Sequence, residues 1–188
     1  MQEKKLILAS KSPRRKEILF NALLPFEIRT KDTEEYYPAN TPVREVPVYL
    51  AQLKANAMLE ELRADEILLT ADTIVLLDGK IYGKPTDFDD AVSILMSLSG
   101  QTHEVITGVC LKSLEKEIVF SETTKVTFKE LNIEEIKYYV ENFTPYDKAG
   151  AYAIQEWIGL IGIAGIRGDY YNIVGLPINK VIAELKKF

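Results

Sequence analysis

The alternation of short apolar runs with amphipathic segments constrains the fold more than any other feature of this sequence. Residues 6–9 form an apolar run of strand length, and residues 14–22 carry apolar side chains at helical spacing. Asp78-Gly79 is a strong hairpin signal after the strand predicted at 66–77, so it interrupts the strand–helix–strand rhythm. This combination predicts an α/β protein with a strongly twisted, mixed β-sheet and flanking helices.

The rest of the chain continues the same alternation. A polar stretch with several prolines follows the strand predicted at 26–30, and it is expected to be a long functional loop. Further helices are predicted at 47–62, at 86–98 with Thr86 as cap, at 132–143 with Asn132 as cap, and after Pro177. Two antiparallel strands at 103–112 and 118–128 are predicted to form a ribbon. Residues 147–155 are expected to be extended, and residues 159–168 to form glycine-rich turns between short strands. With 188 residues and 47% hydrophobic content, the chain is long enough for one domain over residues 1–188, either compact or with two lobes around a central cleft.

Composition narrows the class of protein. The formal net charge of −5 argues against a general nucleic-acid coat or a protein that binds anionic membranes. Cys110 is the single cysteine and His103 the single histidine, so the chain has neither an internal disulfide nor a Cys/His zinc cluster. The apolar run at 6–9 is too short for a signal peptide, and no run reaches the length of a membrane span. We therefore expect a soluble protein of the reducing cytoplasm, with Cys110 buried in its core.

The joint between the first strand and the first helix predicts a phosphate site. Ser12 suits the helix cap and Pro13 the first helical position, whereas Arg14 and Arg15 bring the wrong charge to the positive end of a helix. An anion would neutralise that charge, and the hydroxyls of Ser10 and Ser12 add donors for phosphate oxygens. The alternative is an ordinary Ser-Pro cap followed by solvated basic side chains.

Asp72 is the second candidate, because it interrupts an apolar strand. A buried carboxylate requires a metal, a cation or several hydrogen-bond donors. Glu34 and Glu35 in the long loop could join it in holding a hard divalent cation such as Mg²⁺. The alternatives are an aspartate that stabilises a turn and a solvated acidic patch.

Four further polar residues are weak candidates when each is considered separately. Lys54, Lys84 and Lys148 lie at strand or helix ends or within a helix, where a lone lysine is usually solvated. Gln155 can offer both a donor and an acceptor to the edge of a uracil or thymine ring, although an isolated glutamine is more often structural. No dinucleotide-binding or P-loop fingerprint occurs, and catalysis by a serine or cysteine paired with His103 is disfavoured.

Several ordered motifs together resemble the Maf family of nucleoside triphosphate pyrophosphatases over essentially the whole chain. The segments that carry the resemblance are Leu8-Ala9-Ser10-Lys11-Ser12-Pro13-Arg14-Arg15, Lys54, Ala71-Asp72-Thr73, Gly83-Lys84-Pro85, Leu98-Ser99-Gly100, Ile106-Thr107-Gly108, Asp147-Lys148-Ala149-Gly150-Ala151-Tyr152 and Gly175-Leu176-Pro177. The resemblance implies a Maf/ITPase-like fold with a central substrate cleft. It also implies attack of water on the α-phosphorus of a nucleoside triphosphate, release of pyrophosphate, and dependence on Mg²⁺ or Mn²⁺.

The resemblance also assigns roles to residues. Asp72 matches the proton acceptor and Glu35 an acidic substrate-site or metal-site position. The positions that line the phosphate-binding cleft are Ser10, Ser12, Arg15, Lys54, Lys84 and Lys148. Arg14, Thr73 and Gln155 match the positions that separate the dTTP/UTP branch from the 7-methyl-GTP branch. Glu156-Trp157-Ile158 departs from the Gly-x-Gly that is more usual there.

The mechanism expected from these assignments depends on the acidity of Asp72. An aspartate has a reference pKa of about 3.9, and a neighbouring cation lowers it, so metal binding and orientation of water are expected to matter more than proton abstraction. The family often forms homodimers and has been linked to nucleotide house-cleaning and to arrest of cell division. The competing hypothesis is therefore a nucleotide-binding regulator whose hydrolysis is incidental.

Overall fold

The computed structural model describes residues 4–188 and contains two compact units. Unit 1 comprises residues up to 72, 107–122 and 175–188, and unit 2 comprises 73–106 and 123–174. The strands β3 (Glu66–Leu77), β5 (Thr102–Lys112) and β6 (Glu117–Phe128) contribute residues to both units. Within residues 4–188 the strands form a seven-stranded sheet in the order β2-β1-β3-β5-β6-β7, with β4 paired to β3.

Parallel and antiparallel pairs occur together in this sheet. β1 (Lys5–Leu8) runs parallel to β2 (Phe26–Ile28) and to β3, whereas β4 (Lys80–Tyr82) is antiparallel to β3 and β7 (Ile163–Arg167) is antiparallel to β6. The predicted mixed α/β fold is thereby confirmed. The predictions of one domain and of a central cleft stay predictions.

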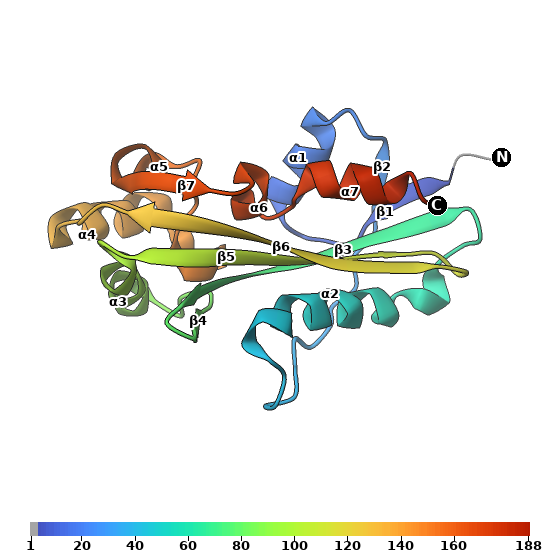
Figure 1. The fold of residues 1–188 in the computed structure, drawn as a ribbon, viewed down its shortest axis with the longest axis horizontal. Helices are drawn as coiled ribbons and strands as arrows, with labels where there is room; N and C mark the ends of the chain where they lie inside the picture. The colour runs from blue at the N-terminus through green and yellow to red at the C-terminus, as the bar shows by residue number, and fades with distance from the viewer. Residues whose placement is uncertain (1–3) are drawn as a thin grey trace. The chain divides into compact units, whose positions relative to one another are not determined.

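Unit 1 places helices on both sides of its strands. Figure 1 shows α1 (Pro13–Asn21) and α7 (Ile178–Leu185) on one side and α2 (Val46–Ala57) on the other. Two short 3₁₀ turns, Val43–Glu45 and Leu59–Glu61, flank α2. The helix predicted at 47–62 therefore ends at residue 57, and residues 59–61 form a separate turn.

The strand period of two determines which residues of β3 and β5 face α2. Leu68 and Cys110 pack in one core cluster with Ala51 of α2, and Thr70 donates a hydrogen bond to the Ala51 carbonyl at 2.7 Å. By the same alternation Gly108 lies on this side of β5. A Cβ built on Gly108 would lie 2.3 Å from the carbonyl carbon of Pro47, so α2 begins in direct backbone contact with the strand.

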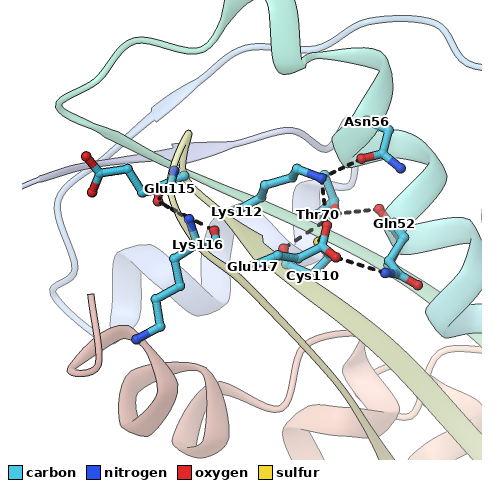
Figure 2. A network of polar contacts seen from close by, with 10 residues as sticks. Gln52, Asn56, Thr70, Cys110, Lys112, Glu115, Lys116 and Glu117 are labelled. Atoms are coloured by element: carbon cyan, nitrogen blue, oxygen red, sulfur yellow. Dashed lines mark hydrogen bonds and ion pairs between the residues drawn. The ribbon is translucent and has the colours of Figure 1, made fainter.

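A polar network at the other end of α2 ties the helix to β5 and β6 (Figure 2). The Lys112 ammonium donates to Asn56 at 2.6 Å and to Glu117 at 2.7 Å, while Gln52 donates to the second Glu117 oxygen at 3.1 Å. Lys112 holds the pKa of the Glu117 carboxyl below its ordinary value. The predicted burial of Cys110 is confirmed: its thiol lies 3.8 Å from Glu117, and burial raises its pKa to about 12.

Unit 2 has its own apolar core, formed where helices pack on its strand segments. Tyr139 and Val140 of α4 are fully buried in it, together with Leu95 and Leu98 of α3. Asn132 and Glu135 form a capping box at the start of α4, as the predicted cap requires. The helical elements of unit 2 are α3 (Phe88–Leu98), α4 (Ile133–Phe143), the 3₁₀ turns Pro145–Asp147 and Ala149–Ala151, α5 (Trp157–Gly162) and α6 (Tyr170–Val174).

Three local predictions in unit 2 were wrong. The cap of α3 is Asp87 rather than Thr86, because the Asp87 carboxylate accepts the Asp90 backbone N–H at 2.9 Å and its charge suits the positive helix end. Residues 147–155 form no strand, since Gly150 and Ala151 adopt φ of +70° and +58° between the extended Lys148 and Tyr152. Residues 157–162 form α5 instead of turns between strands. Among residues 4–188, no helix combines the length and the apolar character that a membrane crossing requires.

Candidate active site

The first joint of unit 1 forms as a capped helix start that is tied to distant backbone. Ser12 is the cap of α1 and accepts the Arg15 backbone N–H at 3.5 Å, while the Ser12 N–H donates to the Ser10 hydroxyl at 3.2 Å. The Arg15 side chain donates to the carbonyls of Ala71 and Gly175, each at 2.8 Å, and to Ser10 at 3.4 Å. Ser10, Ser12 and Arg15 are therefore brought together beside the residue that precedes Asp72.

Burial lowers the pKa of the Arg15 guanidinium, although the Asp72 carboxylate acts in the opposite direction. Arg14 is half-buried in the same first turn of α1, which contains no acidic residue. The unfavourable cationic charge that the sequence places at this helix end is thus present in the structure.

Lys54 joins the two predicted acidic residues of unit 1. Its ammonium lies 2.6 Å from an Asp72 oxygen and 2.9 Å from a Glu35 oxygen. Lys54 projects from α2, Asp72 from the interior of β3 and Glu35 from the long loop, so three separate segments meet here. Asp72 shares the α2 side of β3 with Leu68 and Thr70 because side chains alternate along a strand. Glu34 is exposed, and the Glu35 side chain is itself 48% exposed.

The pKa of Asp72 differs from the expectation drawn from the sequence. Its side chain is only 13% exposed, and this burial raises the pKa above its ordinary value of 3.8 despite the opposing effect of Lys54 and then of Arg15. The expected lowering by a neighbouring cation was therefore wrong in its net direction, because desolvation of the carboxylate outweighs its attraction to the ammonium. A raised pKa makes Asp72 a stronger base than an exposed aspartate.

The donor set around Lys54 suits a hard divalent cation. Glu35 and Asp72 supply carboxylate oxygens, and Mg²⁺ commonly takes one or two carboxylates and completes its coordination with water and phosphate oxygens. Among residues 4–188, no group of three or more His, Cys, Asp or Glu side chains is arranged to hold a metal ion. Both carboxylates are paired with the Lys54 ammonium, so a divalent cation bound here would share them with that ammonium.

Unit 2 holds the remaining predicted site residues. Gly150 donates its backbone N–H to the Gly83 carbonyl at 3.0 Å, and this contact brings the loop of Lys84 beside the segment of Lys148. Lys84 and Gln155 are exposed. Thr73 is half-buried and directly follows Asp72 in β3.

Lys148 has surroundings that sequence reasoning missed. Its side chain is 9% exposed, and its ammonium lies 2.9 Å from Asp147 and 3.3 Å from Glu156. Glu156 also accepts a short hydrogen bond from the Tyr139 hydroxyl. The departure at Glu156 from the common family pattern was the only signal in the sequence that pointed to this contact, and nothing pointed to Tyr139.

The fold and these residues define an α/β protein in which cations and carboxylates gather at a strand and at helix ends, as in proteins that handle phosphate groups. The chain belongs to the Maf family. The model of that family, described as Maf-like protein, matches residues 5–188.

Two relatives illustrate the similarity. The dTTP/UTP pyrophosphatase of Phocaeicola vulgatus is 50% identical over 188 residues, which cover 100% of this chain and 97% of the relative. The dTTP/UTP pyrophosphatase of Flavobacterium psychrophilum is 52% identical over 181 residues, 96% of this chain and 93% of the relative. Among solved structures, a nucleoside-triphosphatase / dITP/XTP pyrophosphatase from Mycobacterium abscessus matches 97% of this chain and 95% of its own at 13% identity and a TM-score of 0.47.

Proposed function

We propose that this protein hydrolyses dTTP and UTP to the monophosphate and pyrophosphate. The observation that carries the proposal is the cluster of Glu35, Lys54 and Asp72, in which a buried carboxylate with a raised pKa lies against an ammonium. Family membership and the names of relatives near 50% identity support the same reaction. The substrate is a nucleotide rather than a nucleic acid or a membrane component.

Asp72 is proposed to accept the proton of the attacking water. The water oxygen forms a bond to the α-phosphorus, the bond from that phosphorus to the oxygen bridging to the β-phosphate breaks, and pyrophosphate leaves with the bond's electron pair. The proton passes to the Asp72 carboxylate and from there to solvent. In the metal-free protein the raised pKa favours this role, because a base works best when its pKa approaches the working pH, whereas a metal ion on the same carboxylate would lower that pKa.

Cationic and hydroxyl side chains are proposed to bind the triphosphate. Charge on the leaving pyrophosphate is stabilised by groups that are already oriented before reaction. The residues assigned here are Ser10, Ser12, Arg15, Lys54, Lys84 and Lys148. Glu35 and Asp72 would hold Mg²⁺ or Mn²⁺, which, when bound, neutralises charge on the phosphate oxygens.

Arg14, Thr73 and Gln155 are proposed to favour the pyrimidine base. An amide such as that of Gln155 can donate to one carbonyl and accept from the ring N–H of uracil or thymine. Cytosine presents an unprotonated N3 on the same edge, so an amide held in the orientation that fits uracil cannot make both of these hydrogen bonds with it. Unmade hydrogen bonds in a binding site lower the specificity constant for the wrong substrate.

The test is a product assay with dTTP, UTP, CTP, dATP, GTP and 7-methyl-GTP, each with Mg²⁺, with Mn²⁺ and with chelator. We expect dTMP or UMP with pyrophosphate, only when metal is present. Asp72→Asn should lower kcat at least about 100-fold, because it removes the base. Asp78→Asn is the matched control: it removes the same charge from the exposed turn after β3 and should keep wild-type activity.

Two results would contradict the proposal. Orthophosphate as the first product would indicate a phosphatase instead. Tight binding of an uncleaved nucleotide would favour the regulator hypothesis. Near-normal turnover by Asp72→Asn would reject the central role of this carboxylate while leaving the overall reaction in place.

A further inference from the structure

Gln155 lies in a tight turn of unit 2. The Glu156 backbone N–H donates to the Ala153 carbonyl at 3.1 Å, which closes the turn around residues 153–156. Ala153 is buried, whereas Gln155 is exposed at the turn. The direction of the Gln155 side chain therefore depends on how firmly both ends of this turn are held.

The Tyr139 hydroxyl holds both ends of the turn. It accepts the Ala153 backbone N–H at 3.1 Å and donates to the Oε2 atom of Glu156. Together with the bond from Glu156 to the Ala153 carbonyl, these contacts form a closed ring of hydrogen bonds. Removing the hydroxyl would leave a buried backbone donor and a carboxylate oxygen without this partner.

Tyr139 is itself fixed by packing. Its side chain is 0% exposed, and its ring stacks on Phe143 with centroids 5.1 Å apart. On the far side of the turn, a Cβ on Gly159 would lie 1.7 Å from the Ile154 carbonyl oxygen, so the start of α5 also approaches the turn closely. A rigid helix residue on one side and a close backbone contact on the other leave the turn little freedom.

The second Glu156 oxygen extends the contact to Lys148. Oε1 lies 3.3 Å from the Lys148 ammonium, while Oε2 accepts from Tyr139. The Glu156 carboxylate thus connects two features: the turn that contains Gln155, and Lys148, which is assigned to phosphate binding. Lys148 is almost completely buried, so its ammonium has few alternative positions.

We propose that Tyr139 and Glu156 are positioning residues that set Gln155 for base discrimination and hold Lys148 in its binding position. This inference rests on the proposed function. In the proposed arrangement neither Tyr139 nor Glu156 contacts the nucleotide. Tyr139 acts through the backbone of the turn, and Glu156 acts through its two carboxylate oxygens. Fixed supporting contacts of this kind matter because small displacements of a binding group reduce reaction rates strongly.

The experiment compares kcat/KM for UTP and CTP in the wild type, Tyr139→Phe, Glu156→Ala and Glu156→Gln, and records the melting temperature of each. Tyr139→Phe should lower the UTP:CTP ratio by about tenfold, because the turn loses its ring of hydrogen bonds. Glu156→Ala should lower the ratio similarly and also raise KM for both nucleotides through Lys148. Glu156→Gln keeps an oxygen that accepts from Tyr139, so its ratio should stay within about twofold of the wild type.

Tyr138→Phe is the matched control. It removes one hydroxyl from the preceding residue of α4, whose side chain is half-exposed and packs on Trp157, and it should leave the ratio unchanged. A wild-type ratio in Tyr139→Phe and Glu156→Ala, with only a lower melting temperature, would overturn the inference and leave the proposed function standing. A wild type that cleaves neither dTTP nor UTP, or does not prefer UTP over CTP, would overturn both.

Discussion

At the scale of single residues, burial of the ionised Asp72 carboxyl opposes the stability of the fold. Burial raises its pKa above 3.8, so the folded protein binds a proton at this carboxyl more readily than the unfolded chain does. A group with a raised folded pKa stabilises the fold below its unfolded pKa, and that contribution is lost as the pH rises through the folded value. The ionised Asp72 that the proposed reaction requires therefore destabilises the metal-free fold.

This destabilisation predicts that replacing the ionisable carboxyl of Asp72 makes the metal-free fold more stable. In chelator-treated protein, Asp72→Asn should be more stable than the wild type at pH 7–8, and the difference should vanish as the pH falls below 3.8. Urea midpoints measured across this range would check it. Asp78→Asn again controls for the loss of one charge, and an Asp72→Asn protein that is less stable at neutral pH would show that pairing with Lys54 outweighs burial.

At the scale of elements, α2 determines where Lys54 lies. The helix is held by backbone contact at Gly108, by the hydrogen bond from Thr70 to Ala51, and by the Lys112–Glu117 network near its end (Figure 2). These contacts connect the helix to β3, β5 and β6. The position of the Lys54 ammonium thus depends on the packing of the whole of α2. The amino-terminal end of this helix lies so close to β5 that position 108 has no room for a side chain.

Gly108→Ala should therefore impair both stability and activity. Its Cβ would lie 2.3 Å from Pro47 backbone, so the helix must shift, at a cost of about 2 kcal/mol or more in the free energy of unfolding and over tenfold in kcat/KM. Denaturant unfolding and the product assay give the two quantities. Gly165→Ala on β7, where a Cβ meets nothing within 4 Å, is the strand control and should change stability by less than about 0.5 kcal/mol.

At the scale of the whole molecule, each unit contains a buried ionisable residue that responds to a different range of pH. In unit 2, burial lowers the pKa of His103 from 6.5 to about 4, and its ring lies among Phe128 and Tyr152 with Nε2 at 2.7 Å from the Tyr152 hydroxyl. In unit 1, the hydrogen bonds from Arg29 lower the pKa of Glu66 from 4.5 to about 2. Neither residue belongs to the candidate site.

Acidification should weaken the protein in two successive ranges. A neutral buried histidine stabilises the fold above pH 6.5, and this contribution, about 3 kcal/mol, is lost as the pH falls to about 4. The Glu66 contribution is complete above pH 4.5 and is lost as the pH falls towards 2. In urea titrations, His103→Phe should remove the first loss and Glu66→Gln the second.

Tyr152→Phe is the control for the histidine, because it removes the hydroxyl partner and keeps the titrating ring. The first loss should therefore persist in this variant. Since His103 is the only histidine in the sequence, persistence of the loss in His103→Phe would exclude the histidine as its source.

Features that depend on near neighbours in the chain could be predicted from the sequence alone. Ser12 with Pro13 starts α1, Asn132 starts α4, and Asp78-Gly79 turns the hairpin, because a cap or a two-residue turn is formed by side chains and backbone only a few residues apart. The family motifs likewise named Glu35 and Asp72 as candidates. Their catalytic and metal-binding roles stay predictions.

The tertiary structure alone decided the quantities that depend on burial and on distant partners. The raised pKa of Asp72 results from desolvation of the buried carboxyl, and its direction is opposite to the one expected from charge alone. Tyr139 and Glu156 meet because α4 packs beside a turn formed later in the chain, and no periodic pattern encodes a single hydroxyl contact. Local rules fix where elements begin, whereas the environment of a charge exists only after the elements have packed together.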